Sequence, residues 1–81
     1  MKKIKISPLY IITGTINNKT YYCAIENGFT YYLASYFIGN ENVIAYCSEE
    51  LAKQNLNIFK QQILRKDIVY NIVKLDFTQI S

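Results

Sequence analysis

Alternating apolar and polar residues in the first half of the chain predict three β-strands separated by two tight turns. The turn signals are Asn17-Asn18 and Asn27-Gly28. Asn-Gly is the strongest short signal for a hairpin, because both residues tolerate the positive φ angles of a two-residue turn. The signals predict an antiparallel meander with strands over 9–16, 19–25 and 29–37.

The lengths of the two turns decide which side chains share a face of this meander. If each turn has two residues, Cys23 lies opposite Ile12 in one neighbouring strand and opposite Tyr32 in the other. Strand residues alternate between faces, so this register sorts the side chains into two sets. One set carries Gly14, which leaves room for an aromatic ring, and we expect it to lie under a helix. The other set includes one glutamate and three threonines, and we expect it to face outward: Ile11, Thr13, Thr15, Thr20, Tyr22, Ala24, Glu26, Phe29, Tyr31 and Leu33.

A single amphipathic helix is predicted in the second half of the chain. Ser48 is a typical helix N-cap, because its hydroxyl can accept a hydrogen bond from an otherwise unpaired backbone N–H. Glu49 and Glu50 place negative charge at the positive end of the helix dipole. The helix is expected to run to about Leu64. Its apolar stripe consists of Leu51, Ala52, Leu56, Ile58, Phe59 and Ile63.

Two further strands complete the predicted fold. A turn at Gly39-Asn40 leads into a short strand over 43–46, and the β-rich segment 68–77 forms the last strand. The element order is therefore β-β-β-β-α-β. This order predicts an α+β fold, in which an antiparallel sheet of four to five strands carries the helix on one face, and a single domain over residues 1–81.

Charge and composition limit the classes of function. The net charge is +3, and the nine cations are scattered and include only one arginine. A nucleic-acid interface needs a dense basic stripe, so this distribution argues against one. Lys5, Ser7 and Pro8 interrupt the apolar start of the chain, so we expect no signal peptide there. No stretch approaches the roughly 18 apolar residues of a membrane span. We therefore expect a cytoplasmic protein without membrane contacts.

The chain lacks the residues on which most catalytic and metal sites depend. It contains no His, and its six carboxylates are dispersed. Cys23 and Cys47 are far apart and have no second pair, so neither a zinc site nor a redox motif can form within one chain. We expect both thiols to be reduced and buried, and we expect no catalytic residue, no metal and no cofactor.

Three segments carry a resemblance that covers most of the chain: YIITGTINNKTYYCAI, VIAYCSEELAKQNLNIF and VYNIVKLD. In these segments the chain resembles small uncharacterised proteins of low-GC Gram-positive bacteria and their phages. In those proteins, strands precede a Ser-Glu-Glu helix start, here within 46–52, and a β-branched strand closes the chain. The resemblance implies no site residues. It does imply a role in the bacterial host, as in phage-encoded inhibitors of host defence such as anti-CRISPR proteins.

The outward face of the predicted sheet is the candidate binding surface. The chain is tyrosine-rich, with eight Tyr in 81 residues, and Tyr is enriched at protein interfaces; an AT-rich coding sequence would supply the same excess. The leading hypothesis is a non-catalytic module of a phage or mobile element that occupies a surface of a bacterial protein. The competing interpretation is that a homodimer buries this face. The alternatives are a homodimeric sponge for a small ligand or nucleotide, and a nucleic-acid-binding accessory protein. The residues expected to form the binding face are Ile11, Tyr22, Phe29, Tyr31 and Leu33.

Overall fold

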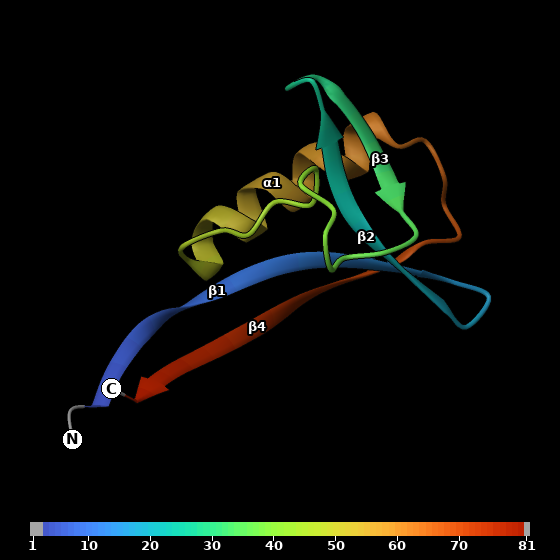
Figure 1. Ribbon diagram of the computed structural model, residues 1–81. Helices are drawn as coiled ribbons and strands as arrows, with labels where there is room; N and C mark the ends of the chain where they lie inside the picture. Colours follow the sequence, from blue (N-terminus) through green and yellow to red (C-terminus); the bar gives the residue numbers. More distant parts are fainter. Residues whose placement is uncertain (1–2, 81) are drawn as a thin grey trace.

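The computed structural model describes the backbone of residues 3–80 and the side chains of residues 8–75. Within them, four strands form an antiparallel sheet and one helix packs on it (Figure 1). The order across the sheet is β3-β2-β1-β4, so the last strand returns beside the first. The predicted α+β class is confirmed. The elements are β1 (Lys3–Ile16), β2 (Lys19–Glu26), β3 (Thr30–Ala34), α1 (Glu49–Gln62) and β4 (Val69–Ile80).

The first hairpin forms as predicted. Asn17 and Asn18 have φ angles of 50° and 66°, as a two-residue type I′ turn requires. The resulting register places Gly14 opposite Tyr21. Gly14 is needed at this position, because a Cβ there would lie 2.8 Å from Cγ2 of Ile68.

The second hairpin differs from the prediction by one residue. Its turn contains three residues, 27–29, instead of two. The pairing therefore places Cys23 opposite Leu33, and the prediction that Cys23 lies opposite Tyr32 is wrong. A slip of one residue moves every side chain of a strand to the other face of the sheet.

This shift places Tyr31 and Leu33 on the helix side of the sheet, although both were predicted to face outward. The Tyr31 ring meets the ring of Phe59 nearly edge-on, with 5.1 Å between centroids, and Leu33 packs against the buried core. Tyr32 and Ala34 take the outward positions. The physical reason is burial, because the three-residue turn removes two large apolar side chains from water.

Segment 42–46 fills the gap that opens where β1 and β2 separate. The β1–β2 ladder covers only the half of β2 nearest the turn. Beyond it, the N–H of Ile25 donates to the Asn42 carbonyl at 2.9 Å, and Tyr10 and Tyr46 exchange backbone hydrogen bonds of 2.8 and 2.7 Å. The predicted strand over 43–46 is therefore present only as two isolated bridges, one to each of the separating strands.

The core lies between α1 and the inner face of the sheet. Ala52 and Phe59 of α1 are fully buried, and they pack with Ile12, Cys23 and Tyr46. The predicted apolar stripe of the helix thus faces the sheet.

The helix differs from the prediction at its margins. Leu51 and Ile58, at one edge of the stripe, remain 40% and 37% exposed. The helix ends at Gln62, earlier than predicted, where the N–H of Ile63 donates to the Phe59 carbonyl at 2.8 Å.

β1 and β4 form a long two-stranded ribbon that extends beyond the helix (Figure 1). β1 begins at Lys3, well before the predicted start at residue 9. Pro8 lies in a β-bulge of this strand, between Ile6 and Leu9. A bulge tolerates proline because a residue in the bulge does not have to donate an N–H to the neighbouring strand. The molecule measures 49 × 24 × 21 Å. Within residues 3–80, α1 is the one helix, and it lacks the length and apolar character needed to cross a membrane.

We predict that Ser48→Ala weakens the fold by removing the N-cap of α1. The Ser48 hydroxyl accepts from the N–H of Leu51 at 3.2 Å. Loss of such a cap costs about 1 kcal/mol, which in a domain of this size lowers Tm by about 4–8 °C. Thermal unfolding followed by circular dichroism measures the shift. Ser35→Ala, at an exposed serine outside the helix, is the control and should leave Tm unchanged.

We predict that the two cysteines react differently. Both are free, but Cys23 is buried and Cys47 is exposed, so the expectation of two buried thiols is wrong for Cys47. Burial raises the pKa of the Cys23 thiol from 9.0 to about 12. A thiol reagent at about pH 8 should therefore modify one thiol in the native chain and both in the denatured chain. Cys47→Ser should leave no reactive thiol in the native chain.

The same pKa shift predicts how stability depends on pH. The folded chain holds the Cys23 proton to a higher pH than the unfolded chain does, so the free energy of unfolding should fall as pH rises from 9.0 towards about 12. Replacement of Cys23 by Ala should make this fall shallower, as measured by urea unfolding across the alkaline range.

Candidate functional site

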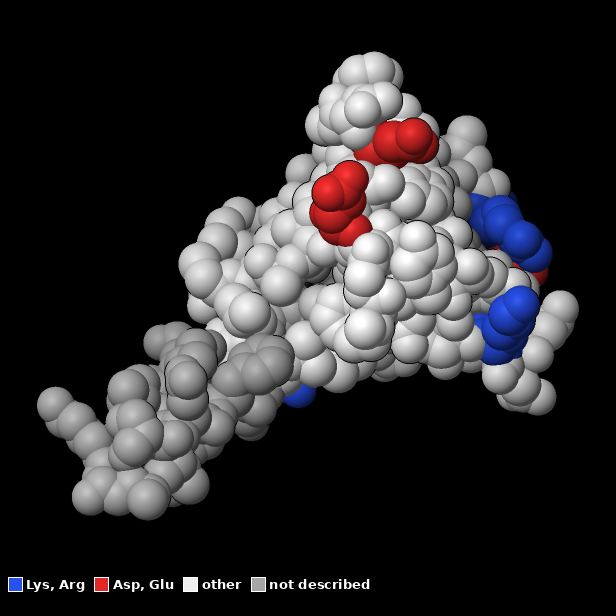
Figure 2. Space-filling view, in the orientation of Figure 1, with Lys and Arg blue, Asp and Glu red and all other residues white. Residues whose placement is uncertain are grey.

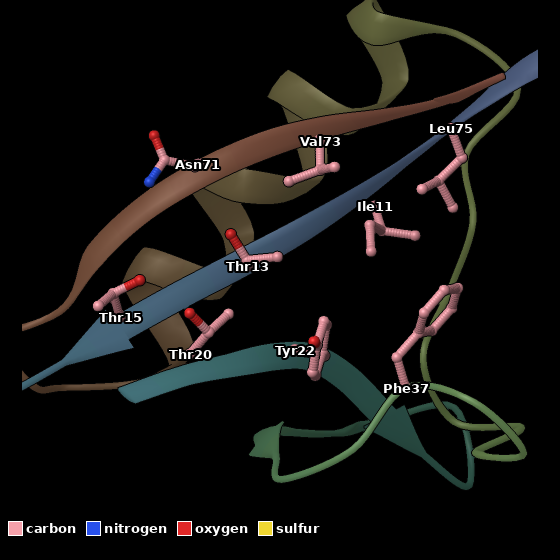
Figure 3. Close-up of a pocket in the computed structure, with 9 residues that line it drawn as sticks. All are labelled: Ile11, Thr13, Thr15, Thr20, Tyr22, Phe37, Asn71, Val73 and Leu75. Carbon is pink, nitrogen blue, oxygen red and sulfur yellow. The ribbon is translucent and has the colours of Figure 1, made fainter. Parts of the chain in front are cut away.

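The outer face of the sheet, opposite α1, is hollowed into an open groove with a volume of about 490 Å³. Figure 3 shows its side chains projecting from β1, β2 and β4 and from the loop after β3, with the helix behind the sheet. Nine residues line it: Ile11, Thr13, Thr15, Thr20, Tyr22, Phe37, Asn71, Val73 and Leu75.

One end of the groove is apolar. The Phe37 ring stacks on Tyr22, with 5.7 Å between centroids and 28° between planes. Ile11 beside them is only 2% exposed, although it lies on the outer face. Val73 and Leu75 extend this apolar surface along β4. Because Val73 remains 37% exposed, part of the apolar lining is open to a ligand.

The other end of the groove carries neutral polar groups. Thr15 pairs with Thr20 across β1 and β2, and Thr13 pairs with Asn71 across β1 and β4. Threonine hydroxyls and asparagine amides can both donate and accept hydrogen bonds. This end can therefore engage peptide groups or other neutral polar groups of a ligand.

The loop that carries Phe37 is held in shape by hydrogen bonds. The N–H of Asn40 donates to the Phe37 carbonyl at 3.0 Å, which closes a turn in which Gly39 has a φ angle of 83°. The Asn42 side chain donates at 3.0 Å to a tyrosine hydroxyl of β3. The turn presents Ile38 to solvent with 84% of its surface exposed. An exposed isoleucine thus directly follows the lining residue Phe37, although it does not itself line the groove.

The structure brings together only part of the predicted binding face. Ile11 and Tyr22 line the groove. Phe29 is 73% exposed at the β2–β3 turn and does not line it, and Tyr31 and Leu33 lie under the helix.

Sequence reasoning missed four of the lining residues. Asn71, Val73 and Leu75 alternate along the last strand and so share one face, but the sequence did not show which strand lies beside it. Phe37 was predicted to end the strand over 29–37, but β3 ends at Ala34 and Phe37 lies in the loop that follows.

Charge plays no part in the lining of the groove, since none of the nine residues is charged. In Figure 2, the visible lysine and arginine side chains gather mainly at one side of the molecule, away from most of the visible acidic surface. Arg65 pairs with Asp67 at 2.6 Å and lowers the pKa of that carboxyl. Lys19 and Lys60 lie 5.4 and 5.8 Å from the centres of tyrosine rings. These lysines therefore already engage aromatic rings of the chain itself.

No protein-family model, curated protein or solved structure matches this chain. Among the described residues, no group of three or more His, Cys, Asp or Glu side chains is placed to hold a metal ion. The ligand of the groove is therefore inferred from the geometry and chemistry of its lining.

We predict that Tyr31→Ser destabilises the fold strongly and Phe29→Ser does not. Loss of the ring packed on Phe59 should cost about 3 kcal/mol or more, whereas a change at the exposed turn should stay within about 0.5 kcal/mol. Urea unfolding of both variants measures the difference. A larger cost for Phe29→Ser than for Tyr31→Ser would contradict the three-residue turn.

Proposed function

We propose that this chain is a non-catalytic protein-binding module whose outer groove and Ile38 turn receive an apolar segment of a partner protein. The observation that carries the proposal is the uncharged groove with an isoleucine that is 84% exposed beside it. Exposed apolar side chains that gather at a hollow typically mark interaction sites.

The energetic support comes from the apolar end of the groove. Burial of one isoleucine side chain against a partner contributes about 1.5–3 kcal/mol. The stacked rings of Tyr22 and Phe37 add rigid aromatic surface, and tyrosines are enriched among the residues that dominate binding energy. The hydrogen bonds that hold the Ile38 turn reduce the entropy that is lost when the partner binds.

The polar end of the groove favours a polypeptide as the ligand. A partner segment brings backbone N–H and C=O groups, which need hydrogen-bond partners when they are buried. The threonine hydroxyls and the Asn71 amide can supply both donors and acceptors. A purely hydrocarbon ligand would leave these groups without partners.

The absence of charge in the groove separates this proposal from nucleotide or nucleic-acid binding. Phosphate recognition relies on clustered Lys and Arg side chains, and the groove has none in its lining. The resemblance to small phage proteins suggests the class of partner. We propose a bacterial defence protein in the host cytoplasm, which the chain would inhibit by occupying one of its surfaces.

The test compares two exposed apolar residues, one beside the groove and one outside it. Ile38→Ser should lower partner affinity by about 30-fold or more, which corresponds to a hot-spot loss of about 2 kcal/mol. Leu64→Ser is the matched control, because Leu64 is 89% exposed and, unlike Ile38, is not next in the chain to a residue that lines the groove. Tagged variants are compared for capture of the same partner from bacterial lysate, and affinity is then measured with that purified partner.

Two results would count against the proposal. Equal losses for Ile38→Ser and Leu64→Ser would show that capture is non-specific. A steep fall in binding affinity with rising salt concentration would indicate that the ligand is a nucleic acid. A protein that contacts six or more phosphates loses about 10³-fold or more in affinity between 50 and 200 mM salt.

A further inference from the structure

β4 leaves one of its edges open. It has 12 residues and is the last strand of the sheet, with β1 on one side and no further strand beyond it within residues 3–80. An edge strand offers backbone N–H and C=O groups to any strand that can lie beside it.

The hydrogen bonds of Tyr10 show which groups of β4 point to that open edge. Tyr10 exchanges both backbone hydrogen bonds with Tyr46, so its N–H and C=O point away from β4. Directions alternate along a strand, so the groups of the next residue, Ile11, point toward β4, where its partner is Val73. The backbone groups of Tyr70 and Ile72, at alternate positions, therefore point to the open edge.

The side chains along this edge do little to block a second strand. Natural edge strands are commonly protected by charges, prolines, bulges or short length. In the part of β4 whose side chains the structure describes, 69–75, the sequence VYNIVKL has one charge and no proline. Val69 and Val73 remain 63% and 37% exposed. The opposite edge of the sheet, β3, is only five residues long.

We infer that a second copy of the chain pairs with β4 in the antiparallel direction, about a two-fold axis at Ile72, and forms a continuous eight-stranded sheet. The strand is self-complementary in this register. Ile72 lies opposite Ile72 of the second copy, and Val69 lies opposite Leu75. The single charge in 69–75 falls opposite Tyr70 rather than opposite its own copy, so no like charges face each other.

This pairing forms a closed dimer, because each copy uses the same edge, and it places both grooves on the same face. An edge-to-edge two-fold axis is perpendicular to the sheet, so both helices lie on one face and both grooves lie on the other. Pairing of β4 with β3 of another copy would instead continue without closure. The dimer would present two grooves side by side to a partner that carries two binding segments.

The test measures mass and amide exchange together on the unmodified chain. The molecular mass measured by sedimentation should double as the protein concentration is raised to about 1 mM. Over the same range, the amides of Tyr70 and Ile72 should exchange more slowly as concentration rises, and those of Asn71 and Val73 should stay slow throughout because they pair with β1. A monomer at every concentration would overturn the inference. A dimer in which the Tyr70 and Ile72 amides exchange at an unchanged rate would overturn it equally.

Three variants separate this interface from the groove. Ile72→Pro removes the outward N–H and should abolish the dimer, whereas Ile72→Ala loses the same side-chain packing but keeps that N–H and should still dimerise. Ile38→Ser, which weakens the proposed partner site, should leave the dimer intact. A dimer that Ile38→Ser splits would instead use the outer face. If Ile72→Pro fails to fold, the exchange pattern of the unmodified chain still decides the question.

Discussion

The paired backbone hydrogen bonds between Tyr10 and Tyr46 hold segment 42–46 against β1. β1 and β2 separate after their turn, and segment 42–46 closes the opening by bonding to both strands. Tyr46 is buried in the core, and Ser48 caps α1 just after it. The bridge therefore places the start of the helix over the sheet.

The groove also depends on the hydrogen bonds of segment 42–46. The chain leaves β3 at one edge of the sheet and must return to the centre at Asn42, where it bonds to β2. The connecting loop places Phe37 on the outer face, stacked on Tyr22, and the turn that follows presents Ile38. Core, loop and candidate site thus depend on one anchoring segment, although they lie on opposite sides of the sheet.

The tyrosines divide between these two sides, and four of the eight serve the core. Tyr10, Tyr31, Tyr46 and Tyr70 pack in or around the buried cluster, while Tyr22 is the one tyrosine in the lining of the groove. Burial raises the pKa of Tyr46 to about 12, and its hydroxyl makes no hydrogen bond within the described part of the chain. Half of the tyrosines therefore serve packing, so the tyrosine excess is not by itself a sign of a contact surface.

Local signals in the sequence determined the elements whose causes are local. The Asn17-Asn18 turn, the Ser48 cap and the apolar stripe of the helix each depend on neighbouring residues, and the structure contains all three. They were sufficient to predict an α+β fold with one helix on an antiparallel sheet.

Tertiary structure decided the turn at 27–29, the bridge of Tyr46 to Tyr10 and the place of Phe37. An Asn-Gly pair fits turns of two or three residues, and only the burial of Tyr31 against Phe59, far along the chain, selects the longer turn. That choice moved two of the five residues of the expected binding face, Tyr31 and Leu33, under the helix. The groove then had to be completed from β4 and from the loop, because side chains distant in sequence share a surface only after the sheet has formed.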